Sequence, residues 1–341
     1  MRQPPPVHYV TTSDGYRIAY CVSGEGRPFV FLPIPLYSIQ RLWGSRFTTQ
    51  WLDGLSGRFR LVQYDIRTQG ASRPRTDADF SIAGHGHDLE AVVDHLQLDR
   101  FVLLAWSGFG HVAVRYAIAN PDRVEALILG CCPVSGGSWP RAMFAELVEE
   151  DWEVFIRSQI PPGLSEEARA TELQLVRQSA TQEASTAGMR VALESNLEDV
   201  LPSLRVPTMV VHPRDYLTLR PEESMKLAAS IREARMVLID GSDVLGDSVQ
   251  GLAAIEAFLN DVLPRAEQAR PVESSTILAY GLSQRQRQVL QLIAQGKTNR
   301  EIAGELVLSE RTVQRHIADL YLKINVRNRA EATSFAMSRL A

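Results

Sequence analysis

The stretch Val102-Leu-Leu-Ala-Trp-Ser-Gly-Phe-Gly110 places a serine between an apolar run and the start of a helical pattern. The apolar run has the length and composition of a buried strand. Ser107 follows this run directly, and the sequence then continues at once in a helical pattern to residue 120. The segment therefore predicts a strand, a sharp turn and a helix in immediate succession, with Ser107 at the turn.

Other β-rich runs lie on both sides of this turn, at intervals that suit intervening helices. The predicted strands are residues 7–12, 17–22, 29–32, 60–65, 101–105, 126–130, 208–212 and 236–240. The predicted helices are residues 82–96, 107–120, 222–231 and 249–263. Strands that alternate with helices form a mainly parallel sheet, so residues 1–262 are predicted to be one α/β domain. From about 134 to 202 the strand signal stops, and amphipathic helical sequence predicts an inserted cap.

Residues 278–341 predict a separate all-α bundle of four short helices. Three pairs of residues have capping-box spacing at predicted helix starts: Ser283 with Gln286, Thr298 with Glu301, and Asn328 with Glu331. The remaining helix begins at Ser309, and its periodicity divides it into an inward set and an outward set. The inward residues are Val313, Ile317, Leu320 and Ile324, and the outward residues are Gln314, Arg315 and Ala318. Gly296 is expected to end the first helix.

The charge of the chain changes at the same boundary. Residues 278–341 contain 10 Lys and Arg against 5 Asp and Glu, whereas the whole chain has a net charge of −4. A basic end on an acidic body indicates phosphate contact confined to one domain. A solvated basic bundle is the alternative, which the coincidence of capping, turn length and exposed face disfavours.

Residues from about 282 to 336 resemble the LuxR-type helix-turn-helix of bacterial transcription regulators. The resemblance implies that the helix starting at Ser309 enters the major groove, where Gln pairs with adenine and Arg with guanine. The DNA-binding candidates are Ser309, Arg311, Thr312, Gln314, Arg315, His316, Ala318 and Lys323. Gln314, Arg315 and Ala318 would read bases, and Thr312, His316 and Lys323 would lie near phosphates. Gln286 and Gln288 stand where the family usually has Glu, and Gln314 where it often has Lys, which affects the expected target sequence.

Several segments of the body resemble the α/β-hydrolase family. They are residues 24–32, 64–72, 88–93 and 120–124, together with the turn at Ser107. The family's nucleophile elbow, G-x-S-x-G, becomes Ala105-Trp-Ser-Gly-Phe109 in this chain. The resemblance implies an α/β-hydrolase fold with a helical cap, in which Ser107 is the relic of a nucleophile.

The same resemblance indicates that the catalytic triad is degenerate. A serine nucleophile needs a histidine to take its proton and an acid to orient that histidine. Tyr216 stands in the place of the acid and Val244 in the place of the histidine. His111, His212 and His316 follow Ser107, but none has a suitable position. The turn that should form the oxyanion hole reads Pro33-Ile-Pro35, and a proline has no N–H to donate.

These losses predict a hydrolase fold that acts as a receptor and not as an enzyme. The candidate ligand-binding residues are Ile34, Trp106, Ser107, Gly108, Tyr216 and Val244. This mixture suits a largely apolar ligand with one or two polar groups. Four aromatic residues of the cap either roof the site or form a helix core: Trp139, Phe144, Trp152 and Phe155. The alternative function is an active serine esterase or amide hydrolase that would need Asp215 or Asp243 as an unorthodox base. A third possibility is a single-turnover sensor in which Ser107 is acylated once and never released.

The remaining features bear on cofactors and location. No run of eighteen apolar residues and no apolar leader is present, so we expect a cytoplasmic protein. The three cysteines lack disulfide or metal spacing and are expected to be buried apolar residues. His85 and His87 beside Asp88 suggest a metal, but a solvated helix start is favoured because no third ligand is in view. No metal and no cofactor are expected.

Together the two domains predict a ligand-responsive transcription regulator. Residues 263–277 form a polar linker with two prolines between them, so their placement is expected to be adjustable. The expected partners are double-stranded promoter DNA and a small-molecule ligand. We expect a homodimer to bind a pseudo-palindromic site in the DNA. RNA polymerase is a further candidate partner.

Overall fold

The computed structural model describes residues 4–263 and 289–340, except 35, 46, 73–77, 141–145, 161–163, 217, 291, 307–309, 325 and 327. The chain divides into two compact units, Met1–Arg265 and Ala266–Ala341. The predicted linker beyond residue 263, the capping pair at Ser283 and the helix start at Ser309 lie outside the described residues.

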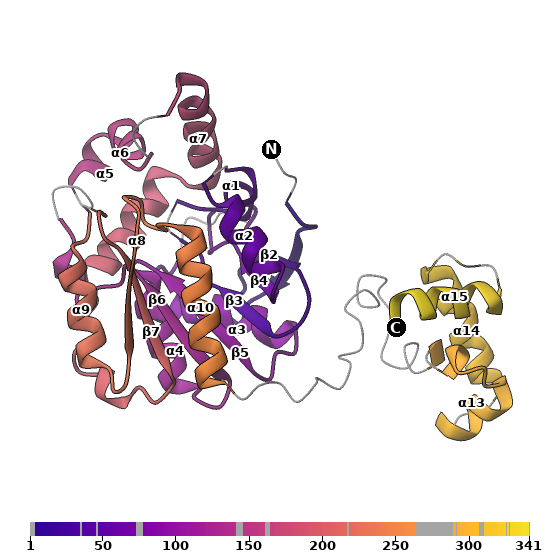
Figure 1. The fold of residues 1–341 in the computed structure, drawn as a ribbon. Coiled ribbons are helices and arrows are strands. Elements are labelled where there is room, and N and C mark those ends of the chain that lie inside the picture. The colour runs from indigo at the N-terminus through magenta and orange to yellow at the C-terminus, as the bar shows by residue number, and fades with distance from the viewer. Residues whose placement is uncertain are drawn as a thin grey trace. The chain divides into compact units, whose positions relative to one another are not determined.

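The first unit is built on an eight-stranded sheet (Figure 1). Its strands are β1 His8–Thr11, β2 Arg17–Ser23, β3 Pro28–Phe31, β4 Arg60–Tyr64, β5 Phe101–Trp106, β6 Val124–Gly130, β7 Thr208–Pro213 and β8 Arg235–Ile239. Their order is β1-β2-β4-β3-β5-β6-β7-β8. Only the pairings of β2 with β1 and β4 are antiparallel, so the sheet is mainly parallel as predicted.

Helices cover both faces of this sheet and bury two separate cores. One face carries α3 Ile82–His95, α4 Phe109–Ala119 and α9 Pro221–Ser230. The other carries α1 Ile39–Gly44, α2 Thr49–Ser56 and α10 Ser248–Val262. The sequence did not predict α1 and α2, because both are short and owe their place to a few buried side chains such as Trp51. The α/β-hydrolase architecture places the carboxyl ends of the parallel strands at one edge, where a site is expected.

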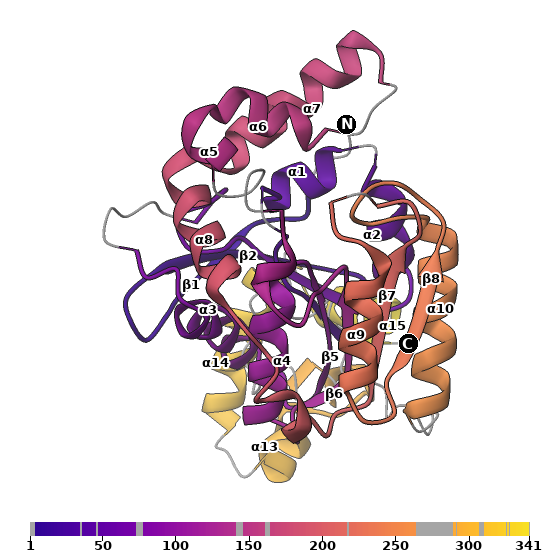
Figure 2. The ribbon, with the colours of Figure 1, turned by 90° about the vertical axis from the view of Figure 1, so that its left-hand side faces the viewer.

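The predicted cap is helical and lies beyond that edge (Figures 1 and 2). It contains α5 Leu147–Glu150, α6 Trp152–Ser158, α7 Glu166–Ser179 and α8 Gln182–Glu194. Three of these helices begin with a hydroxyl or carboxylate side chain that accepts a backbone N–H, namely Asp151, Ser165 and Thr181. The cap packs around a core of its own that includes Val148, Phe155 and Val176.

The second unit is helical in its described part. Its helices are α13 Asn299–Leu306, α14 Glu310–Ile324 and α15 Arg329–Leu340. Thr298 Oγ1 accepts the N–H of Glu301 at 3.3 Å while Glu301 accepts the N–H of Thr298 at 2.7 Å, which confirms that capping box. Asn328 Oδ1 accepts the N–H of Glu331 at 2.9 Å, and Glu331 accepts from the side-chain amide of Asn328 at 3.0 Å.

The turn before α13 has the predicted glycine at its centre. Gly296 has a φ of +80°, and its N–H donates to the carbonyl of Ile293 while Lys297 donates to Leu292. These two bonds form a Schellman motif, which requires a left-handed residue. Val313, Ile317 and Leu320 of α14 lie in the core of this unit, as their spacing predicted. The side chain of Ile324 lies outside the described residues.

No helix among the described residues is both long and apolar enough to span a membrane. Cys21, Cys131 and Cys132 are free and buried, which confirms the expectation that they pack as small apolar residues.

Candidate ligand pocket and DNA-binding helix

The turn at Ser107 has the geometry of a nucleophile elbow. Ser107 has a φ of +57°, a left-handed conformation that is strained for any residue but glycine. Its N–H donates to the carbonyl of Gly130 at 2.8 Å, and its carbonyl accepts the N–H of Gly110 at 3.0 Å. A Cβ on Gly110 would lie 2.3 Å from the sulfur of Cys132, so glycine allows α4 to pack closely on the sheet. The fold therefore still holds Ser107 in the strained position.

A pocket of about 220 Å³ lies between this elbow and the cap. Five of the predicted ligand-binding residues line it: Ile34, Ser107, Gly108, Tyr216 and Val244. They come from four separate loops, which only the folded sheet brings together. Pro35, the proline expected to lack an oxyanion-hole donor, lies outside the described residues.

The prediction for Trp106 was wrong. Its side chain is 1% exposed and packs edge-on against Trp51 at 5.8 Å between ring centroids. Because side chains alternate along a strand, Trp106 points into the core beneath α2 and α10 while Ser107 begins the turn. It does not belong to the lining of the pocket.

The cap aromatics divide between the two interpretations. Trp139 lines the pocket. Trp152 and Phe155 stack on each other at 5.7 Å and pack within the cap core, so the helix-core interpretation holds for them. Phe144 lies outside the described residues.

Neither described histidine that follows Ser107 in this unit is placed to accept its proton. His212 is fully buried, with Nδ1 2.8 Å from Ser224 Oγ and Nε2 3.0 Å from the carbonyl of Leu219. His111 has Nε2 3.0 Å from the carbonyl of Pro133. Burial lowers the pKa of both imidazoles, which favours their neutral forms.

The two triad positions hold groups that differ from an acid and a base. Burial is the main cause that raises the pKa of Tyr216, so its phenol stays protonated. Val244 contributes an apolar wall. Of the two carboxylates considered as unorthodox bases, Asp215 is exposed and outside the described lining, whereas Asp243 lines the pocket. Asp243 Oδ1 accepts the N–H groups of Leu245 at 2.9 Å and Gly246 at 3.0 Å.

His85 is a pocket residue that the sequence interpretation missed. It was assigned to a solvated helix start, but it is 6% exposed, lies against Phe109 at 5.0 Å and lines the pocket. The signal was present in the periodicity, because His85 is in phase with Leu89 and Val92 on the buried face of α3. His87 is partly exposed, as that interpretation expected.

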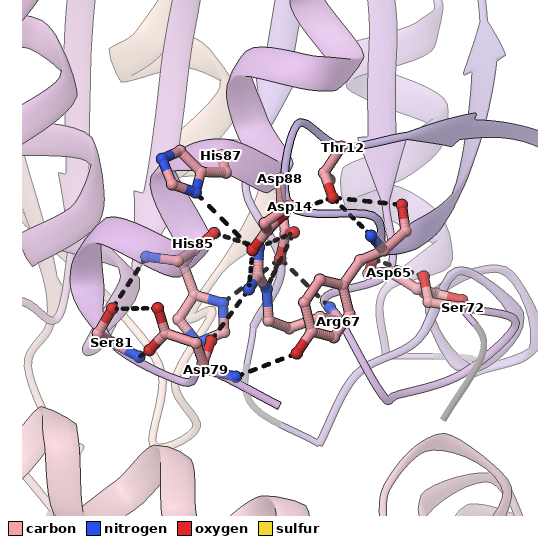
Figure 3. A network of polar contacts seen from close by, with 12 residues as sticks. Thr12, Asp14, Asp65, Arg67, Ser72, Asp79, Ser81, His85, His87 and Asp88 are labelled. Carbon is pink, nitrogen blue, oxygen red and sulfur yellow. Dashed lines mark hydrogen bonds and ion pairs between the residues drawn. The ribbon is translucent and has the colours of Figure 1, made fainter. Parts of the chain in front are cut away.

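Behind His85 lies a buried polar network centred on Arg67 (Figure 3). The fully buried Arg67 guanidinium contacts Asp88 and Asp14, each at 2.8 Å, and donates to the carbonyl of Gly84 at 2.6 Å. His85 Nδ1 lies 3.5 Å from Asp88. Arg67 thus occupies the point where the carboxylates of Asp14 and Asp88 converge. The described residues contain no cluster of three side chains that could bind a metal ion.

The DNA-binding candidates lie on α14 of the second unit. Gln314 and Ala318 are exposed on this helix, as predicted, and His316 is half-buried. Arg311, Thr312, Arg315 and Lys323 stand on the same helix, and their side chains lie outside the described residues together with the whole of Ser309.

Comparison with known proteins agrees with both units. Residues 281–336 match the family model of bacterial regulatory proteins of the luxR family. The chain ends in a LuxR-type DNA-binding domain. Residues 43–145 match the model of the α/β hydrolase fold, so this LuxR-type regulator is fused to a hydrolase-fold domain.

Individual relatives of this LuxR-type regulator match one part of it or the other. A pimeloyl-[acyl-carrier protein] methyl ester esterase from Nitrosomonas europaea is 28% identical over 204 residues, which are 55% of this chain and 79% of the esterase. An uncharacterized transcriptional regulatory protein of Bacillus subtilis is 45% identical over 58 residues, 17% of this chain and 27% of that protein. A bromoperoxidase structure from Bacillus anthracis has a TM-score of 0.66 at 19% identity and covers 75% of this chain and 100% of its own. That likeness shows the fold alone.

Proposed function

We propose that this LuxR-type regulator binds a small, largely apolar molecule in the pocket beside Ser107 without turning it over. Ligand binding then changes the affinity of the LuxR-type domain for promoter DNA, to which the protein binds as a homodimer. The observation that carries the proposal is that no described histidine of the first unit after Ser107 in the sequence is free to accept its proton. Val244 lines the wall where the family's histidine would stand, and His111 and His212 are buried against other partners.

The pocket residues have distinct roles in this proposal. Ile34 and Val244 contribute apolar surface, whereas Ser107 and Tyr216 offer hydroxyl groups. The N–H of Gly108 lies at the start of α4, where the first backbone donors of a helix have no partner within that helix. A polar ligand group therefore finds donors and acceptors beside a mainly apolar wall.

The test is intact mass of the full chain, native and then denatured, after exposure to acyl and aromatic metabolites. A reversible receptor gives an adduct in the native spectrum that disappears on denaturation. Gly188→Leu should abolish that adduct, because Gly188 lines the pocket and a Cβ there meets nothing within 4 Å. Gly86→Leu is the matched control, since Gly86 also lies in a helix with open space around it.

The alternative is an active or single-turnover esterase, and one observation favours keeping it. Ser107 and the Asp243 carboxylate line the same pocket. An adduct that survives denaturation and is lost in Ser107→Ala, or release of alcohol from an ester at a rate that depends on Ser107, would replace the receptor proposal.

A further inference from the structure

Three residues that line the pocket each have a buried polar side-chain atom with no hydrogen-bond partner among the described residues. The three atoms are Gln69 Oε1, His85 Nδ1 and Ser185 Oγ. Their residues are exposed by 6%, 6% and 5%. A buried polar group without a partner is rare in a folded protein, because its hydration is lost and nothing replaces it.

The three groups reach the pocket from separate parts of the fold. Gln69 lies in the loop after β4, His85 in α3 and Ser185 in α8 of the cap. His85 Nδ1 lies 3.5 Å from the Asp88 carboxylate, which is already bonded to Arg67. Three separate segments of the chain therefore each bring one unpartnered polar side-chain atom to the residues around one cavity.

The charges of the residues that line the pocket limit which ligand groups can hydrogen-bond to these three atoms. Among the described lining residues Asp243 is a carboxylate, and none is lysine or arginine. An anionic ligand would be buried near a like charge and without a cation, which is costly in a low-dielectric site. Gln69 Oε1 accepts and does not donate, so the ligand must bring a donor. A simple ester has no such donor.

Resting on the proposed function, we infer that the pocket selects an apolar molecule with an uncharged head group that both donates and accepts hydrogen bonds. A primary carboxamide is the simplest example. Gln69, His85 and Ser185 bind this head group, and the apolar body lies against residues such as Phe80, Val112 and Met189. Binding supplies the missing partners of the three buried atoms, which gives the ligand its affinity and its specificity.

The test uses three probes with one phenylalkyl body, namely phenylbutyramide, phenylbutyrate and butylbenzene, titrated calorimetrically into the full chain. Phenylbutyramide should bind most tightly. In Ser185→Ala its affinity should fall about fivefold, the loss of one neutral hydrogen bond, while butylbenzene binding is unchanged. The Tm of the unliganded variant should rise by roughly 2 °C, since an unpaired buried hydroxyl has been removed.

Ser179→Ala is the matched control. Ser179 is also a buried helical serine, but its hydroxyl donates to the carbonyl of Leu175 at 2.7 Å and bonds Ser38 at 2.8 Å. Its replacement should lower the Tm and leave the preference among the probes unchanged. A merely structural Ser185 would behave like Ser179, with a lower Tm in the alanine variant.

Different failures separate the inference from the proposed function. If phenylbutyrate binds most tightly, or if Ser185→Ala leaves the ratio of phenylbutyramide to butylbenzene affinity unchanged, the inference is overturned while the receptor proposal stands. If none of the probes binds and Gly188→Leu changes no adduct in the mass spectra, both are overturned.

Discussion

His111, one turn beyond Ser107 on α4, makes the stability of the hydrolase-fold domain depend on pH. Burial lowers its pKa from 6.5 to about 4, although a bond to the carbonyl of Pro133 opposes the shift. Between these values the unfolded chain binds a proton that the folded chain does not, so stability falls as the pH falls from 6.5 to 4. The loss from this group is about 3 kcal/mol.

His111→Gln should remove that part of the acid sensitivity, because glutamine does not titrate and keeps a donor for Pro133. Urea unfolding of both proteins across this pH range measures the difference. An unchanged slope in the variant would mean that His111 is protonated in the folded protein.

Arg67 is the residue on which the buried network of Figure 3 depends. Arg67→Met leaves the fully buried Asp88 carboxylate without its cation, and removal of one partner of a buried ion pair costs about 3–5 kcal/mol. The double variant Arg67→Met with Asp88→Leu should recover most of that loss. Arg177→Ala is the control, since Arg177 and Glu153 form an exposed pair worth little. Thermal unfolding that ranks all three variants equally would refute this account.

At the scale of elements, the elbow helix and its neighbour respond oppositely to the same substitution. Gly110→Ala pushes α4 away from the sheet, because its Cβ would lie 2.3 Å from the sulfur of Cys132. We expect a loss of about 1–3 kcal/mol from this overpacking. Gly86→Ala in α3 meets nothing within 4 Å and should gain about 1 kcal/mol through helix propensity. Differential scanning calorimetry of the two variants measures both signs, and a stabilised Gly110→Ala would show that α4 is free to shift.

At the scale of the whole molecule, the LuxR-type domain should separate positioning on DNA from reading of its sequence. The family resemblance places Lys323 near a phosphate and Arg315 at a base. Lys323→Ala should therefore weaken binding to all sequences alike and lower the slope of log affinity against log salt by about 1. Arg315→Ala should instead relax selection at one base position, at a cost of about 1–3 kcal/mol for the preferred site.

Fluorescence anisotropy with a duplex selected by the protein and a scrambled duplex, over a salt series, measures both quantities. Equal binding of wild type to the two duplexes would contradict the assignment of α14 as the reading helix.

The sequence alone determined the strands of the first domain and the capped helix starts of the second, but not the short helices α1 and α2. All eight predicted strands are present within two residues of their predicted ends, because burial of alternate or continuous apolar runs leaves a local pattern. The capping boxes at Thr298 and Asn328 were readable for the same reason, since their partners lie three residues apart. Family motifs placed Ser107, Tyr216 and Val244, and the structure brings all three to one pocket.

The tertiary structure decided which neighbours of those residues face the pocket. Trp106 adjoins Ser107 in sequence but points into the opposite core, because successive side chains of a strand alternate. His85, Gln69 and Ser185 are far from Ser107 in the chain and carry no motif, yet they line the same cavity, and each has a buried side-chain atom with no hydrogen-bond partner among the described residues. A missing hydrogen bond is a property of three-dimensional surroundings, so only the folded chain reveals which polar groups remain for a ligand.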